Sequence, residues 1–212
     1  FLPQFWQNAG LIGYHTGATA FVTLSGFAIG TLLAIPLALL IASYPTLGNG
    51  IYPLLNILQI APKTIVAPLL IVWLGTGLGP QIALTVVMTF FPILVDSILG
   101  FRSIDPRLNH IARSTGASAF QTFRYIRWPA ALPYVFSGLK IGMVSAVTGA
   151  VVVEYIASNR GLGYLTLYAS SRFDMPVMFA AIFMTALLGL VLNLLLASLE
   201  FVLMPWTWRA AR

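Results

Sequence analysis

Few side chains in this sequence are suited to covalent or metal chemistry, and they do not form a cluster. The chain of 212 residues has no cysteine, two histidines and five acidic residues. His15 and His110 lie far apart in sequence, without the spacing of a metal site or a catalytic group. Lys140 follows Gly138 and Leu139 but lacks the glycine spacing of a phosphate-binding loop. The sequence therefore predicts no catalytic residue, metal or cofactor in this chain.

The composition indicates a membrane protein rather than a soluble enzyme or a nucleic-acid binder. Hydrophobic residues make up 59% of the chain and charged residues 8%, whereas a soluble domain averages about 25% charged residues. The net charge of +6 does not indicate nucleic acid, because the basic residues lie between apolar segments, as in the positive-inside pattern. The absence of cysteine excludes disulfides, and the residues after Phe1 lack the layout of a signal peptide.

Five apolar segments are each close to the roughly 20 residues that cross a bilayer as a helix. They predict an all-α, polytopic membrane fold with one long polar loop, residues 101–129. The expected spans are residues 16–44, 51–74, 81–99, 132–156 and 177–203, with a short helix within 158–175. We expect residues 1–15 to form an interfacial lead-in, 16–206 the transmembrane domain and 207–212 a cytoplasmic tail.

The second span is the irregular one. Pro53, Pro62 and Pro68 interrupt it, and each proline removes a backbone hydrogen-bond donor. Lys63 lies near its middle, where a charge should face protein or water rather than lipid. Two hypotheses remain open for Lys63: a place on a translocation pathway, or a structural pairing inside the helix bundle.

The other charged residues of the spans lie nearer to the span ends than Lys63 does, where a charge can reach water more easily. Asp96 and Glu154 lie near span ends and are interpreted mainly as interfacial residues. Glu154 is also a second candidate, beside Lys63, for the translocation pathway. Lys140 lies about two turns into the fourth span, from which its long side chain can reach towards the cytoplasm.

The polar loop fixes the expected orientation. It carries five basic residues against the single acid Asp105, so it is assigned to the cytoplasm. Alternation through the spans then places the amino-terminal lead-in, residues 75–80 and residues 158–175 outside, and the carboxyl terminus inside. The basic residues of the loop are Arg102, Arg107, Arg113, Arg124 and Arg127.

Local signals in this loop predict a helix, a turn and a second helix. Asp105 followed by Pro106 is a favourable helix start. Gly116 suits the left-handed residue that ends a helix. Ser118 and Gln121 have the spacing of a capping box, which starts the second helix.

Pro129 is expected to end this second helix, and Phe120 and Phe123 are expected to share one of its faces. From these residues alone, an alternative is an ordinary basic loop whose amphipathic helices rest on lipid headgroups.

The spacing of the loop resembles the "EAA" signature of importer permeases in the ABC superfamily. The signature runs Glu-Ala-Ala, three residues, Gly, nine residues, then Ile-x-Leu-Pro. Ala112, Gly116, Ile126 and Pro129 stand at the matching positions. The departures are His110 for Glu, Ile111 for the first Ala and Trp128 for Leu, and His110 removes any ion-pair role expected at that position.

The wider sequence is similar to the nitrate/sulfonate/taurine-type permeases, over residues 62–80, 112–142 and 152–176. The resemblance implies the type I permease fold with five core helices in the bacterial inner membrane. It implies a homodimer of permeases, an extracytoplasmic solute-binding protein and two cytoplasmic ATPase subunits that bind ATP and Mg. Members commonly carry a further helix ahead of this core, so the sequence leaves open whether one precedes Phe1.

The resemblance also implies what the loop does. A short helix seated on the ATPase would transmit its movement to the flanking spans as a rigid-body shift. Gly116 is expected to form the turn, and Arg124 to pair with acidic groups of the ATPase. The residues assigned to ATPase coupling are Ala112, Gly116, Ala117, Ser118, Phe120, Phe123, Arg124 and Pro129.

The solute remains open at this stage. The resemblance favours a small anion such as a sulfonate or nitrate, and a neutral heterocyclic precursor is the alternative. A self-contained secondary transporter or a purely structural membrane subunit would leave the loop signature unexplained. The sequence does not decide whether the permease has a solute-binding site of its own.

Overall fold

The computed structural model describes residues 8–44, 50, 55, 57, 62–103, 105, 107–108, 112 and 114–205. Within these residues every regular element is a helix, and no strand occurs. The all-α prediction is therefore confirmed.

Four helices are long and apolar enough to cross a membrane: α2 (Ala9–Ser43), α5 (Leu78–Arg102), α8 (Trp128–Ala157) and α10 (Met175–Leu203). Four long apolar helices confirm a polytopic membrane fold. Of the second expected span, residues 51–74, the structure describes mainly the end. A 3₁₀ turn, η1 (Lys63–Ile65), leads there into the short helix α4 (Val66–Leu74). The count of five spans stays a prediction, because much of residues 51–61 lies outside the described residues.

The first long helix begins earlier than its expected span. α2 starts at Ala9, so the second half of the expected lead-in belongs to the helix. This extension carries Ile12 and His15 into the protein interior, where they are 2% and 5% exposed. His15 is thereby placed beside groups that are far away in sequence.

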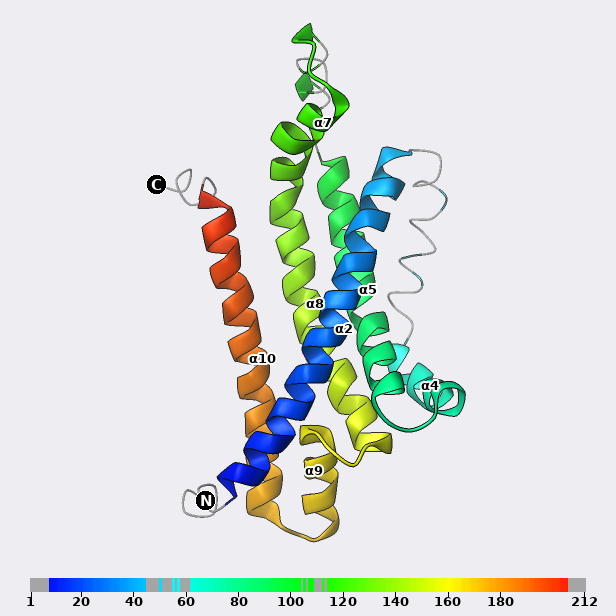
Figure 1. Cartoon of the computed structure of the whole chain (residues 1–212), viewed down its shortest axis with the longest axis vertical. Helices are drawn as coiled ribbons and strands as arrows, with labels where there is room; N and C mark the ends of the chain where they lie inside the picture. Colours follow the sequence, from blue (N-terminus) through cyan, green and yellow to red (C-terminus); the bar gives the residue numbers. More distant parts are fainter. Residues whose placement is uncertain are drawn as a thin grey trace.

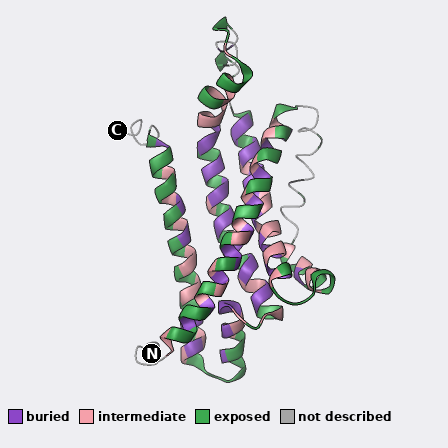
Figure 2. Ribbon diagram, in the orientation of Figure 1, coloured by how far each residue is buried: buried purple, intermediate pink, exposed green. Residues whose placement is uncertain are grey.

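Close backbone contact joins α2, α5 and α8 into one core. A side chain on Gly26 of α2 would overlap Thr85 of α5, and a Cβ on Gly149 of α8 would lie 3.1 Å from the Thr85 Cα atom. A Cβ on Gly142 would lie 2.8 Å from Ile93 on α5. Small residues let membrane helices approach closely and gain van der Waals contact. α5 is therefore held between α2 and α8, with buried positions along its whole length (Figure 2).

α10 is packed differently. Only five of its side chains are buried, Val177, Ala180, Ala181, Leu192 and Leu196, and Figure 2 shows it mostly exposed or half-buried. An ion pair between Lys140 of α8 and Glu200 joins the two helices near the carboxyl end of α10. The last long helix is thus attached to the core more loosely than α2, α5 and α8 are to one another.

The two ends of the bundle differ in what they carry (Figure 1). The amino end of α2, the α4–α5 connection and the short helix α9 (Leu162–Ser171) lie at one end. The short helix α7 (Ala119–Thr122) projects at the other end, where α10 also terminates. The arrangement matches the expected alternation, and the basic segment remains the reason to assign the α7 end to the cytoplasm.

Candidate coupling segment and buried polar cluster

The projecting segment begins with the predicted cap. The Asp105 carboxylate accepts the Arg107 N–H at 2.8 Å, and the Asp105 carbonyl accepts the Leu108 N–H at 3.0 Å. These bonds satisfy donors that the first turn of a helix leaves free. The neighbouring Pro106, His110, Ile111 and Arg113 lie outside the described residues.

Gly116 ends this turn in the left-handed conformation, as predicted. Its φ is 71°, and the Ala117 N–H donates to the Ala112 carbonyl at 2.9 Å. A bond from the residue after the left-handed position back to the fifth residue before it is the Schellman arrangement. A Cβ on Gly116 would meet nothing within 4 Å. The need for glycine therefore comes from the backbone conformation rather than from crowding.

The capping box at the start of α7 is also confirmed. The Ser118 Oγ accepts the Gln121 N–H at 3.2 Å, and the Gln121 Oε1 accepts the Ser118 N–H at 2.7 Å. Two orphan backbone donors are satisfied reciprocally. Gly116 and this box fix the direction in which α7 leaves the turn.

The expectation that Pro129 ends the helix is wrong. Helix continues from Ala119 to Ala157, through a π-helical turn, η2 (Phe123–Arg127), into α8. In the wide turn the Trp128 N–H bonds the Phe123 carbonyl, five residues back. A π turn changes the register of the carbonyls just where Pro129 lacks a donor and would crowd the preceding turn, so the proline is accommodated. α7 is consequently the end of the α8 rod and not a separate helix on a loop.

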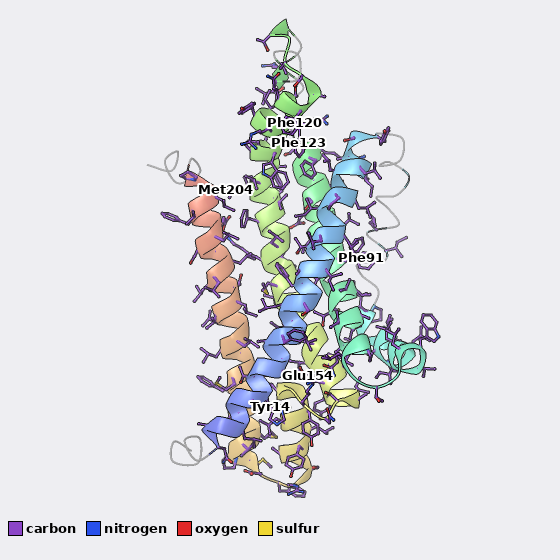
Figure 3. All side chains as sticks on the ribbon, viewed as in Figure 1. Tyr14, Phe91, Phe120, Phe123, Glu154 and Met204 are labelled. Atoms are coloured by element: carbon purple, nitrogen blue, oxygen red, sulfur yellow. The ribbon has the colours of Figure 1, made fainter. Side chains whose placement is uncertain are left out.

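The two phenylalanines of this segment have different surroundings (Figure 3). Phe120 is 70% exposed, whereas Phe123 packs against the core with its ring centroid 6.0 Å from that of Trp128. Ser118 and Arg124 are exposed and Ala117 is half-buried. Tyr125, 71% exposed, was not singled out from the sequence although it is aromatic and stands beside Arg124. Phe120 and Tyr125 are the most exposed aromatic side chains of this segment and are available to a partner.

Lys63 is half-buried at the start of η1, directly after Pro62. Its ammonium lies 5.5 Å from the centroid of the Phe91 ring on α5. An aromatic face offers electrostatic compensation to a cation in a poorly hydrated place. Lys63 therefore has an aromatic contact within the protomer, and its place on a pathway stays a prediction.

Asp96 and Lys140 lie against other helices rather than simply at an interface. Asp96 is half-buried, and its Cβ is 2.9 Å from where a Cβ on Gly138 would stand. Lys140, expected to extend towards the cytoplasm, forms the ion pair with Glu200. Both charges therefore take part in contacts made by α8.

Glu154 corrects the sequence interpretation most clearly. It is 1% exposed, and its Oε2 accepts the Thr19 hydroxyl at 2.9 Å and the Gly163 N–H at 3.0 Å. Figure 3 shows it where α2, α8 and α9 converge. A carboxylate enclosed in its own protomer is not an interfacial residue, and the place of Glu154 on a translocation pathway stays a prediction. Both donors bond Oε2, whereas Oε1 is buried without a hydrogen-bond partner among the described residues, so the carboxylate is only partly compensated.

The same cluster contains His15, which joins α2 to the turn before α9. The His15 Nδ1 accepts the Gly161 N–H at 3.0 Å, and the Thr19 hydroxyl oxygen accepts the Leu162 N–H at 2.8 Å. The His15 ring also stacks on Tyr164, with centroids 5.7 Å apart. The polar cluster of His15, Thr19, Glu154 and residues 161–163 holds α9 to α2 and α8. It contains too few ligands for a metal site, and no group of three such ligands occurs among the described residues.

A family model matches residues 16–206, which is most of the chain. The family is described as the binding-protein-dependent transport system inner membrane component.

Several curated relatives are similar over most of their length. The riboflavin transport system permease of Chloroflexus aurantiacus is 38% identical over 96% of this chain and 76% of the relative. The formylaminopyrimidine transport permease of Halalkalibacterium halodurans is 35% identical over 91% of this chain and 77% of the relative. The taurine transport permease of Escherichia coli is 29% identical over 96% of this chain and 74% of the relative.

Solved structures share the fold at lower identity. A chain of an amino acid ABC transporter superposes with a TM-score of 0.72 at 15% identity, covering 97% of this chain and 98% of that one. A chain of the MetNI methionine ABC transporter superposes with a TM-score of 0.72 at 19% identity, covering 96% of this chain and 97% of that one. The protein belongs to the family of binding-protein-dependent transport system inner membrane components, and it is a multi-pass permease subunit of an ABC importer.

Proposed function

We propose that this permease works as a homodimer that two cytoplasmic ATPase subunits drive and an extracytoplasmic binding protein supplies. The observation that carries this proposal is the projecting segment, in which Gly116 and the Ser118–Gln121 capping box orient α7. An ordinary loop has no need of a left-handed glycine turn and a capping box beside an exposed Phe120. A partner that grips α7 would cover this side chain.

The continuity of α7 with α8 supplies the mechanism. The helix from Ala119 to Ala157 is one rod, so a displacement of α7 by the ATPase is passed into α8 without an intervening loop. α8 in turn contacts α5 closely at Gly142 and Gly149. The closing and opening of the ATPase pair would therefore tilt the α5–α8 core, which alternately exposes the solute pathway to either side.

Hydrolysis belongs to the partners in this proposal. The chain has no phosphate-binding loop, so ATP and Mg are expected to bind in the ATPase subunits. The permease supplies the pathway and the attachment points. It would act as a transporter subunit without a reaction of its own.

For the solute, we favour a neutral heterocyclic precursor. The relatives named for riboflavin and formylaminopyrimidine are 38% and 35% identical, above the 29% of the taurine permease. The second candidate is a small anion such as a sulfonate or nitrate, which Lys63 favours because a half-buried ammonium attracts negative charge.

Solute-stimulated ATPase activity tests this choice. The permease would be reconstituted in proteoliposomes with its ATPase and binding protein, and hydrolysis measured with riboflavin, formylaminopyrimidine, taurine or nitrate. We expect stimulation by one of the two heterocycles and none by nitrate or by the sulfonate taurine. Stimulation by nitrate or taurine alone would contradict the heterocycle proposal and support the second candidate.

A further inference from the structure

A groove runs between α8 and α10. Two adjoining hollows of about 320 and 350 Å³ form it, and both are lined by Thr185 and Ala186. Small-molecule sites typically enclose about 300–1,000 Å³. The groove exists because α10 carries small residues here, such as Ala186 and Gly189, and because α10 packs loosely on α8.

Uncharged polar groups lie among the apolar walls of this groove. The first hollow has Thr148 of α8 and Asn193 of α10, and the second has Tyr155 and Thr166. No charged side chain lines either hollow among the described residues. A ligand in this groove would therefore find hydrogen bonds from neutral groups and contacts with apolar side chains.

The threonine hydroxyls of the groove can still accept a hydrogen bond. The Thr148 and Thr185 hydroxyls donate to the carbonyls four residues earlier, at 3.1 and 2.9 Å, so each oxygen keeps acceptor capacity. The Asn193 Oδ1 has no hydrogen-bond partner within the described part of the chain, and it is shielded from solvent. A ligand donor would reach this oxygen after a rotation of the Asn193 side chain, and the new hydrogen bond would offset the cost of leaving the amide oxygen unpaired.

The position of these groups argues against a lipid-filled groove. α10 has 29 residues and spans about 43 Å at 1.5 Å per residue, which places Thr185 and Asn193 well inside it. Elsewhere α10 exposes mainly large apolar side chains, such as Leu194 at 57% and Leu195 at 62%. An asparagine at such depth usually contacts another helix or a pathway rather than lipid.

The groove has defined ends. Towards the carboxyl end of α10 it stops short of the Lys140–Glu200 ion pair, which ties α8 to α10. Towards the other end it reaches Gly163 and Thr166 of α9, next to the buried carboxylate of Glu154. It therefore extends from the extracytoplasmic helix α9 to a charged contact on the expected cytoplasmic side.

We propose that this groove binds the solute in transit and that its ligand class is an uncharged ring system with hydrogen-bond donors on its edge. This inference rests on the importer function proposed above. The apolar walls suit the faces of a ring, and the threonine and asparagine oxygens suit its edge donors. An anion would lose its water there without gaining a positive partner.

Cysteine accessibility tests the inference directly, because the chain contains no cysteine of its own. Thr148→Cys, Thr185→Cys and Gly189→Cys would each be placed in the reconstituted complex. A charged, membrane-impermeant thiol reagent is added with and without riboflavin, formylaminopyrimidine or taurine, and label is read on the separated chain. Leu194→Cys and Leu195→Cys are the lipid-facing controls on the same helix.

We expect labelling at the three groove positions, at least tenfold slower labelling at the controls, and protection of the groove positions by a neutral heterocycle. Absence of labelling in the groove would overturn the proposal, since lipid or another protomer would then cover it. Labelling without protection, or protection by taurine alone, would overturn the ligand class. ATP-driven uptake, measured on the same preparation, reports separately on the importer function.

A hydroxyl deletion supplies the second test. Thr185→Val keeps the shape of the side chain and removes its oxygen, and we expect the apparent KM for the heterocycle to rise about three- to tenfold. Thr16→Val is the matched control, because Thr16 on α2 also donates to a carbonyl four residues earlier, at 2.7 Å, but lies outside the groove. Equal KM changes in the two variants would contradict a contact between Thr185 and the solute.

Discussion

At the scale of single residues, Gly116 has the most sharply defined role. Its φ of 71° is unfavourable for residues with a Cβ, although open space surrounds the position. Gly116→Val should therefore cost about 1–3 kcal/mol in the turn alone. We expect weaker ATPase binding or hydrolysis uncoupled from uptake, with normal membrane insertion, measured by co-purification and by uptake per ATP hydrolysed.

Gly116→Asn separates conformation from size. Asparagine tolerates the left-handed region, so this variant should retain most of the coupling. Normal coupling in Gly116→Val, or equal losses in both variants, would show that the left-handed turn is not what the ATPase requires.

Phe120 is the exposed apolar side chain expected to anchor the ATPase. Truncation of an anchoring aromatic commonly weakens an interface by 2 kcal/mol or more, so Phe120→Ala should lower ATPase affinity about thirtyfold. The affinity can be measured by titrating detergent-solubilised permease with labelled ATPase. Tyr134→Ala, which removes a 43% exposed aromatic from α8 further along the rod, is the control. Unchanged affinity in Phe120→Ala would remove this residue from the interface.

Lys63 distinguishes the two solute classes. Lys63→Met removes the charge and keeps most of the apolar length, so uptake of an anion that uses the pathway charge should fall at least tenfold while ATPase activity remains. Lys63→Arg should keep uptake, because its charge is retained. Uptake of a neutral heterocycle should be unaffected by either change. Undiminished anion uptake in Lys63→Met would contradict a place for Lys63 on the pathway.

At the scale of elements, the buried polar cluster explains how α9 is held in place. Glu154→Ala would leave the Gly163 N–H without its buried acceptor, while the Thr19 hydroxyl would donate only to the His15 carbonyl, at 3.2 Å. An unpaired buried donor costs about 1–3 kcal/mol, so the thermal midpoint of the purified permease should fall by several degrees. Glu154→Gln keeps the size of the side chain and one acceptor oxygen, so its thermal midpoint should fall less than that of Glu154→Ala. Equal midpoints for wild type and Glu154→Ala would show that the cluster does not stabilise α9.

The elements also show which features the sequence can predict. The turn at Gly116 and the Ser118 cap follow from the sequence because their bonds join residues at most five apart. Glu154 was misread because Thr19, 135 residues away, decides its burial. The end of the second helix was misplaced because the π turn that accommodates Pro129 has no recognised local sequence signal.

At the scale of the whole molecule, the structure combines a rigid part and a looser one. α2, α5 and α8 share glycine contacts, while α10 touches α8 across a groove and through the Lys140–Glu200 pair. Because α7 is continuous with α8, the proposed function implies that force from a cytoplasmic partner would enter the rigid part first. α10 and its groove can then change their spacing relative to that core.

The central claim is that energy comes from an ATPase partner through the projecting segment. The most direct measurement is solute accumulation in proteoliposomes, with the chain alone under an ion gradient and with its ATPase and binding protein under ATP. The account predicts accumulation only in the complete system with ATP, and its loss in Gly116→Val. Robust accumulation by the chain alone under an ion gradient would contradict the account.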